Sequence, residues 1–114
     1  MNKKAAGNRG ESIAKAYLKK IGYKIIETNF RYSGGEIDII ALDKEVTVYI
    51  EVKYRSNLNF GFPAEAVTAH KRHKIVEGAK NYSLIHHLAN APQRFDVIEI
   101  LGDEINHIVA AFEA

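Results

Sequence analysis

The 114-residue sequence has no cysteine, and no apolar run in it approaches the length of a membrane span. The absence of cysteine excludes disulfide bonds, thiolate metal ligands, zinc fingers and a cysteine nucleophile, and it favours a reducing, cytoplasmic setting. The residues after Met1 are positively charged but lead into no apolar stretch. We therefore expect neither a signal peptide nor a membrane partner.

Strong charge of one sign is also lacking. A formal net charge of +2 is too small to indicate a nucleic-acid partner by itself. Basic residues nevertheless gather in three places, as they also do on ordinary solvated surfaces: Lys3, Lys4 and Arg9; Lys53 and Arg55; Lys71, Arg72 and Lys74. The length and the average composition predict one folded domain over residues 1–114.

Two segments have the apolar spacing of amphipathic helices. The first covers residues 11–21 and is followed by Gly22, a natural helix stop. Its apolar stripe consists of Ala14, Tyr17, Leu18 and Ile21. The second covers about residues 65–88, and its stripe consists of Ile75, Ala79 and Tyr82.

The remaining regular segments have the composition of strands: residues 23–30, 36–42, 46–55, 94–101 and 105–112. Together with the helices they predict the order αβββαβ with one further C-terminal strand. This order favours an α/β fold in which a mixed central β-sheet is flanked by helices.

The segments 36–42 and 46–55 predict a hairpin whose charged side chains share a face. Side chains alternate along a strand, so Glu36, Asp38 and Ile40 are expected on one face. Ile37, Ile39 and Ala41 are then expected on the opposite face. In the following strand, one face carries the alternate residues Thr47, Tyr49, Glu51, Lys53 and Arg55.

A two-residue turn at Lys44-Glu45 would place Asp38 directly opposite Glu51, whereas a four-residue loop would shift the register but keep both side chains on one face. Two adjacent carboxylates in an apolar sheet repel each other, and burial disfavours their charged forms. Mg²⁺ or Mn²⁺ would remove that conflict, because such a cation takes one or two protein carboxylates together with water and phosphate. Lys53 could then position or deprotonate a water, or neutralise charge on a phosphate. A salt-bridge ladder on a solvated face is the alternative interpretation.

Glu11 provides a separate indication. It lies almost two helical turns before Leu18, near the stripe that faces the core, so its carboxylate is expected to lean toward the sheet. Glu11 also opens the predicted helix, where the helix dipole favours an acidic residue. The two explanations are compatible.

Further residues around this site are candidates for contact with nucleic acid. Basic residues suited to phosphate contacts are Arg31, Arg55, Lys71, Arg72 and Lys74. The aromatic residues Tyr32, Phe60 and Phe62 could stack on an unpaired base or pack beneath a loop. His70 and His73 have helical spacing but no evident third ligand, so no metal site is expected there.

The motifs resemble those of known nucleases. Gly35-Glu36-Ile37-Asp38 followed by Glu51-Val52-Lys53 resembles the split Asp and Glu-x-Lys motif of restriction-endonuclease-like nucleases. Other segments resemble the YraN family of small bacterial proteins, which is related to Holliday-junction resolvases: Gly10-Glu11, Gly22-Tyr23, Asn29-Phe30-Arg31, Phe60-Gly61 and Arg94-Phe95-Asp96-Val97.

This resemblance implies a restriction-endonuclease-like fold with the same order of elements. It also implies that Asp38 and Glu51 are metal ligands, that the Val52 carbonyl is a further ligand, that Lys53 is the catalytic lysine and that Glu11 is a helical acid near the metal.

The leading hypothesis is therefore a Mg²⁺- or Mn²⁺-dependent endonuclease that hydrolyses DNA phosphodiester bonds. Branched or junction DNA is suggested by analogy with the resolvases. One alternative is a nucleic-acid-binding protein that keeps the fold without catalysis, and another is a domain that binds neither metal nor nucleic acid. A homodimer would suit the cleavage of two strands.

Overall fold

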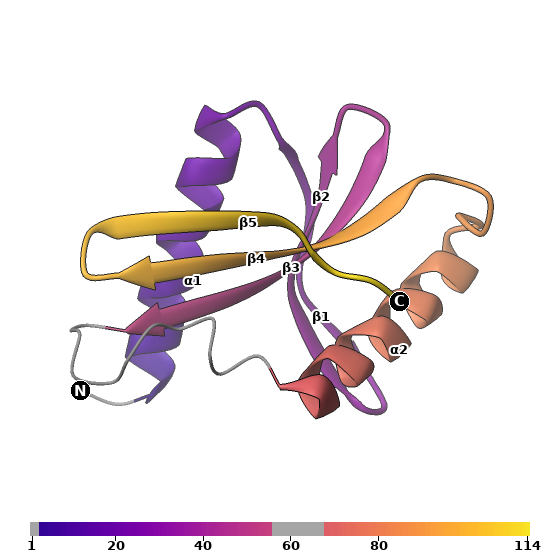
Figure 1. Ribbon diagram of the computed structural model, residues 1–114, viewed down its shortest axis with the longest axis horizontal. Coiled ribbons are helices and arrows are strands. Elements are labelled where there is room, and N and C mark those ends of the chain that lie inside the picture. Colours follow the sequence, from indigo (N-terminus) through magenta and orange to yellow (C-terminus); the bar gives the residue numbers. More distant parts are fainter. Residues whose placement is uncertain (1–2, 56–67) are drawn as a thin grey trace.

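The computed structural model of the chain describes residues 3–55 and 68–114. Its elements are α1 (Lys3–Lys20), β1 (Lys24–Tyr32), β2 (Gly35–Asp43), β3 (Val46–Arg55), α2 (Ala69–Ile85), β4 (Gln93–Leu101) and β5 (Glu104–Phe112). The predicted order of one helix, three strands, one helix and two strands is confirmed (Figure 1). Phe60, Gly61 and Phe62 lie outside the described residues.

The five strands form one mixed sheet in the order β1-β2-β3-β4-β5. β3 and β4 are parallel, and the other three neighbouring pairs are antiparallel. Parallel neighbours need a crossover connection, and α2 lies in the connection between β3 and β4. Of the two helices in the described part of the chain, neither has the length and apolar character of a membrane-spanning helix.

The two helices cover opposite faces of the sheet. Val48 and Ile50 of β3 belong to a buried cluster with Ala14 and Leu18 of α1. Tyr49, which lies between them in the strand, belongs to the cluster on the α2 side. Neighbouring residues in a strand point to opposite faces, so the sheet is packed on both sides. The residues of α2 in the second cluster are those of the predicted stripe, Ile75, Ala79 and Tyr82.

α1 differs from the predicted helix at both ends. It begins at Lys3, well before the predicted start at Glu11. It ends at Lys20, and Gly22 then adopts the left-handed conformation, with a φ of +97°, that commonly ends a helix. Ile21 therefore lies beyond the helix and is 44% exposed, so its assignment to the apolar stripe is wrong.

α1 approaches β3 closely at Gly10. A Cβ atom on Gly10 would lie 2.7 Å from the Cβ of Tyr54 in β3, closer than two carbon atoms can pack. Gly10 is buried, and it immediately precedes Glu11. The missing side chain thus lets the helix bring Glu11 close to the sheet.

The close approach predicts an unusual response to Gly10→Ala. Alanine favours a helix over glycine by about 1 kcal/mol, so the substitution would normally stabilise the protein. Here we expect it to lower the free energy of unfolding by about 1–3 kcal/mol, because the new methyl group overlaps Tyr54. Urea denaturation measures the change. Ser12→Ala, at an exposed position of the same helix, is the control and should leave stability within about 0.5 kcal/mol.

Candidate functional site

Of the even-numbered loops considered for the hairpin of β2 and β3, the structure has the two-residue turn, because Asp43 pairs with Val46. Regular pairing extends to Ile39 opposite Ile50, so Asp38 is the next residue along β2. Here the Asp38 carboxylate accepts a hydrogen bond from the N–H of Val52 at 2.8 Å. The Asp38 side chain thus accepts the hydrogen bond of a backbone amide at the point where the pairing between the two strands ends.

The strict alternation predicted for β2 is wrong at this point. Ile39 packs in the α1 cluster, but Ile37 packs in the α2 cluster with Ile40. On β1, Asn29 lies between the residues that pair with Ile37 and Ile39, and its φ is +54°. Both strands are therefore irregular at the same level. Because of this irregularity, the side chains on either side of Asp38 do not alternate between the two faces of the sheet as they do in a regular strand.

Glu36 consequently does not share a face with Ile40. The Asn29 side-chain amide donates to Glu11 at 3.1 Å and to Glu36 at 2.9 Å, so it links α1 with β2. Ile40 packs instead on the α2 side. Glu36 also forms an ion pair with Arg31 at 3.3 Å, at the exposed end of this chain of contacts.

Glu51 is buried between two lysines. Its side chain is 6% exposed, and its Oε1 atom lies 2.9 Å from the Nζ of Lys53 and 2.9 Å from the Nζ of Lys71. Lys53 follows Glu51 in β3 and is 11% exposed, whereas Lys71 reaches it from the first turn of α2. The structure therefore brings Glu51 and Lys53 together, as predicted, and adds a lysine from a distant segment.

The surroundings of Asp38 disfavour the charged form of its carboxyl. Burial, the neighbouring charge of Glu51 and, to a smaller extent, that of Glu11 together raise the pKa of its carboxyl to about 7. The Val52 N–H and Lys53 act in the opposite direction. A carboxyl whose pKa is raised by burial and by like charges is typical of functional sites.

The pKa values of the two lysines are shifted in opposite directions. Burial lowers the pKa of Lys53, and the neighbouring Lys71 lowers it further, against the opposing effect of Glu51. Burial alone would lower the pKa of Lys71, but its contacts with Lys53 and Glu51 raise it above its usual value. Lys53 is thus the lysine that gives up its proton more readily.

Glu11 approaches this site from α1, as predicted. It contributes to the raised pKa of Asp38 and accepts a hydrogen bond from Asn29. The second explanation for Glu11, an acidic residue at the start of the helix, is wrong because α1 begins at Lys3 and has no acidic residue in its first turn. Glu11 lies in the middle of the helix, where the dipole has little effect.

The predicted phosphate-contact residues differ in their surroundings. Arg31 is 84% exposed, and Arg72 and Lys74 are exposed on α2. Lys71 is engaged with Glu51, and the side chain of Arg55 lies outside the described residues.

Tyr32 is not a loop aromatic, because it ends β1 and packs under α2. Its hydroxyl donates to the Lys74 carbonyl, and a Cβ atom on Gly78 would lie 2.5 Å from the Cε1 of its ring. It is therefore held by packing within the fold rather than presented to a base.

Within residues 3–55 and 68–114, no group of three or more His, Asp or Glu side chains is arranged to hold a metal ion. The oxygen donors of Asp38 and Glu51 nevertheless suit Mg²⁺, which binds through one or two carboxylates and keeps several waters. The groove of about 570 Å³ between α2 and the ends of β4 and β5 lies elsewhere, and its lining includes neither of these acids.

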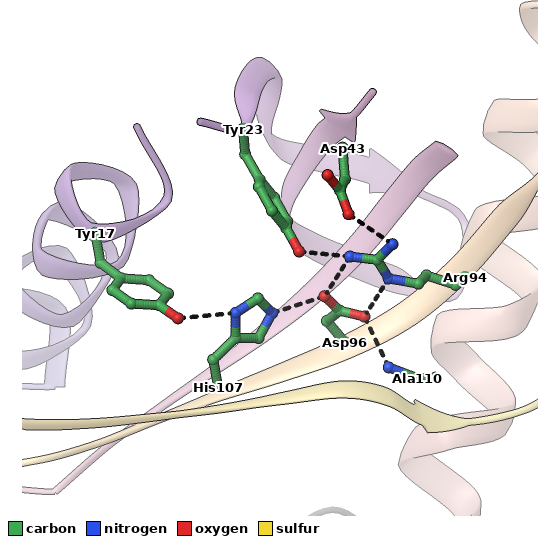
Figure 2. A network of polar contacts seen from close by, with 7 residues as sticks. All are labelled: Tyr17, Tyr23, Asp43, Arg94, Asp96, His107 and Ala110. Carbon is green, nitrogen blue, oxygen red and sulfur yellow. Dashed lines mark hydrogen bonds and ion pairs between the residues drawn. The ribbon is translucent and has the colours of Figure 1, made fainter. Parts of the chain in front are cut away.

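A second polar network lies on the α1 face of the sheet (Figure 2). Asp96 of β4 is fully buried at its centre and accepts hydrogen bonds from the Arg94 guanidinium at 3.0 Å and from the Ala110 N–H at 3.0 Å. Its other oxygen lies 2.7 Å from the Nε2 of His107, whose Nδ1 contacts the Tyr17 hydroxyl at 3.0 Å.

This network ties together five elements or their ends. Arg94 also binds Asp43 at the end of β2 and the hydroxyl of Tyr23, just before β1. Burial alone would raise the pKa of Asp96, but its hydrogen bonds with His107, Arg94 and the Ala110 N–H together hold it below the usual value. The charge of Asp96 is thus matched inside the protein, which indicates a structural role.

Three residues of the site region were not predicted in these roles. Asn29 connects Glu11 with Glu36, Gly10 permits the close approach of α1, and Lys71 contacts Glu51 directly. Asn29 and Gly10 occur in the short segments that resemble the YraN family, which is the signal that could have identified them. Lys71 was predicted only as a candidate for phosphate contact.

The raised pKa of Asp38 predicts that the stability of the protein falls as the pH rises. Between its ordinary pKa, about 4, and the folded value of about 7, the folded protein holds a proton that the unfolded chain has lost, so stability falls as the pH rises. Asp38→Asn removes the titration and keeps an oxygen for the Val52 N–H. We expect it to stabilise the protein at pH 8 by on the order of 2 kcal/mol, and little at pH 4.

Chemical denaturation at several pH values, without divalent cations, measures this difference. Glu45→Gln, in the exposed turn of the same hairpin, is a matched control in which no such pH-dependent gain is expected. Equal stability of Asp38→Asn and the wild type at pH 8 would contradict the electrostatic account.

Asp96→Asn is expected to have the opposite effect. The folded pKa of Asp96 lies below the unfolded one, so its contribution to stability is complete at neutral pH and is lost as the pH falls below about 4. Removing its charge leaves Arg94 without its buried partner. We expect a loss of about 3–5 kcal/mol at pH 7 by urea denaturation. A variant as stable as the wild type would show that the network is dispensable.

Comparison with known proteins agrees with the motifs. Residues 10–100 match the model of the uncharacterised protein family UPF0102, and the predicted resemblance to the YraN family is confirmed. A UPF0102 protein of Caldanaerobacter subterraneus is 46% identical over 119 residues, covering 98% of each chain. Another, of Clostridioides difficile, is 48% identical over 114 residues, covering 98% of this chain and all of that protein. The chain belongs to the UPF0102 family.

Proposed function

We propose that this protein is a metal-dependent endonuclease that hydrolyses phosphodiester bonds in DNA. The observation that carries the proposal is the combination of the half-buried Asp38 with the buried Glu51 and Lys53 at the end of the β2–β3 ladder. The raised pKa of Asp38 means that this carboxyl lowers the free energy of unfolding at neutral pH, which is unexpected for a group that serves only stability. The cost is understandable if the group serves in binding or catalysis.

Asp38 and Glu51 are the residues that would hold Mg²⁺ or Mn²⁺, with the Val52 carbonyl and Glu11 as further oxygen donors. All four are hard oxygen groups, and the repulsion that raises the pKa of Asp38 is of the kind that a divalent cation relieves. When bound, the cation supplies Lewis-acid stabilisation of negative charge on the phosphate and increases the acidity of a water molecule.

Lys53 is the proposed proton acceptor. Its pKa is lowered by burial and by Lys71, so its neutral amine is more accessible near neutral pH than that of an exposed lysine. Its contact with Glu51 fixes the position of the amine beside the carboxylates. In its charged form, the same group would neutralise charge on the phosphate.

A nucleic acid is the proposed substrate because exposed basic residues belong to the elements that form the site, and DNA is proposed by analogy with the nucleases that the motif resembles. Arg31 lies on β1, and Arg72 and Lys74 lie on α2, the helix that also provides Lys71. These residues suit phosphate contacts, which position a nucleic acid without reading its sequence. Branched DNA is the substrate of choice for the first assays, and a homodimer would place two sites on one junction.

The proposal is tested by incubating branched, duplex and single-stranded DNA with the protein and Mg²⁺ or Mn²⁺. We expect cleavage that is lost on chelation and reduced by about 10²–10⁴-fold in Lys53→Met. Glu51→Gln should have a similar effect. Lys80→Met, an exposed position further along α2, is the matched control and should cleave like the wild type.

The alternative is a nucleic-acid-binding protein without catalysis. It is favoured by the exposed basic residues alone, and it predicts binding that weakens steeply with salt while the DNA remains intact. Cleavage that is equal in the wild type and in Lys53→Met would point to a contaminating nuclease and overturn the proposal.

A further inference from the structure

Two lysines meet at one oxygen of Glu51. Lys53 and Lys71 each place their Nζ atom 2.9 Å from Oε1, so two ammonium groups share a single carboxylate atom. A carboxylate oxygen has about two lone-pair positions for such contacts. Any cation that binds Glu51 through Oε1 must therefore displace one of them.

The two lysines are not equally easy to displace. Lys53 is 11% exposed and belongs to the central strand β3, whereas the Lys71 side chain is 40% exposed. The backbone of Lys71 is fixed, because its N–H donates to the hydroxyl of Thr68, the N-cap of α2. Only the side chain of Lys71 has to move for its ammonium to leave Glu51 and reach water.

We infer that Lys71 is an internal counter-ion that competes with the divalent cation for Glu51 and withdraws when the cation binds. The inference rests on the proposed function. In the resting protein Lys71 compensates a buried carboxylate that would otherwise be costly. In the loaded protein its ammonium is released at the entrance of the site, where it can contact a phosphate of the substrate.

The inference is tested by calorimetric titration of Mn²⁺ into the wild type and Lys71→Met. Methionine keeps an unbranched side chain but removes the competing charge. We expect Lys71→Met to bind Mn²⁺ about tenfold more tightly than the wild type, since the cation no longer displaces an ion pair. Lys74→Met removes the same charge from an exposed position of α2 and measures the general electrostatic effect, which should be much smaller.

A second measurement follows the lysine ammonium groups of the wild type by nitrogen NMR during titration with Mg²⁺. The signal of Lys71, assigned by its absence in Lys71→Met, should move toward the position of exposed lysines, whereas that of Lys53 should remain distinct. This readout reports the displacement itself and does not depend on cleavage.

The outcomes separate the two proposals. If the wild type binds Mn²⁺ and Lys71→Met binds it no more tightly than Lys74→Met does, the competition is excluded while the metal site stands. An unmoved Lys71 signal at saturating Mg²⁺ excludes it as well. If neither the wild type nor Lys71→Met binds Mn²⁺ and neither cleaves DNA, both the inference and the proposed function are overturned.

Discussion

The hydrogen bond between the Asp38 carboxylate and the Val52 N–H is the constraint on which the site depends. It holds a charged group inside a sheet at the level where regular pairing between β2 and β3 ends. A carboxylate can occupy such a position only if backbone donors or cations offset the loss of water. The raised pKa of Asp38 means that the resting protein offsets this loss incompletely.

Two carboxylates of the sheet have opposite electrostatic surroundings. Asp96 is surrounded by Arg94, His107 and a backbone N–H, and its pKa is lowered. The pKa of Asp38 is raised, first by burial and then by the neighbouring charge of Glu51. Full internal compensation suits a group that only holds strands together, while incomplete compensation leaves the group ready to bind a cation. This contrast separates the structural carboxylate, Asp96, from Asp38, which we propose as a cation ligand.

The order of elements was predictable because each has a local cause. The stripe of Ile75, Ala79 and Tyr82 defines α2, and the two-residue turn at Lys44-Glu45 defines the hairpin of β2 and β3. The start of α1 and the reversed face of Ile37 were not predictable in this way. The reversal depends on the left-handed conformation of Asn29 in a neighbouring strand, and single-strand periodicity contains no information about it.

The pairing of Glu51 with Lys53 follows from strand parity, but the arrival of Lys71 depends on the path of the chain between two parallel strands. β3 and β4 are neighbours, so the connection must cross one face of the sheet, and α2 covers the face that carries Tyr49. Glu51 has the same parity as Tyr49 and therefore faces this crossover. The topology thus brings the Lys71 ammonium to the buried Glu51 carboxylate, and it makes the first turn of α2 part of the candidate site.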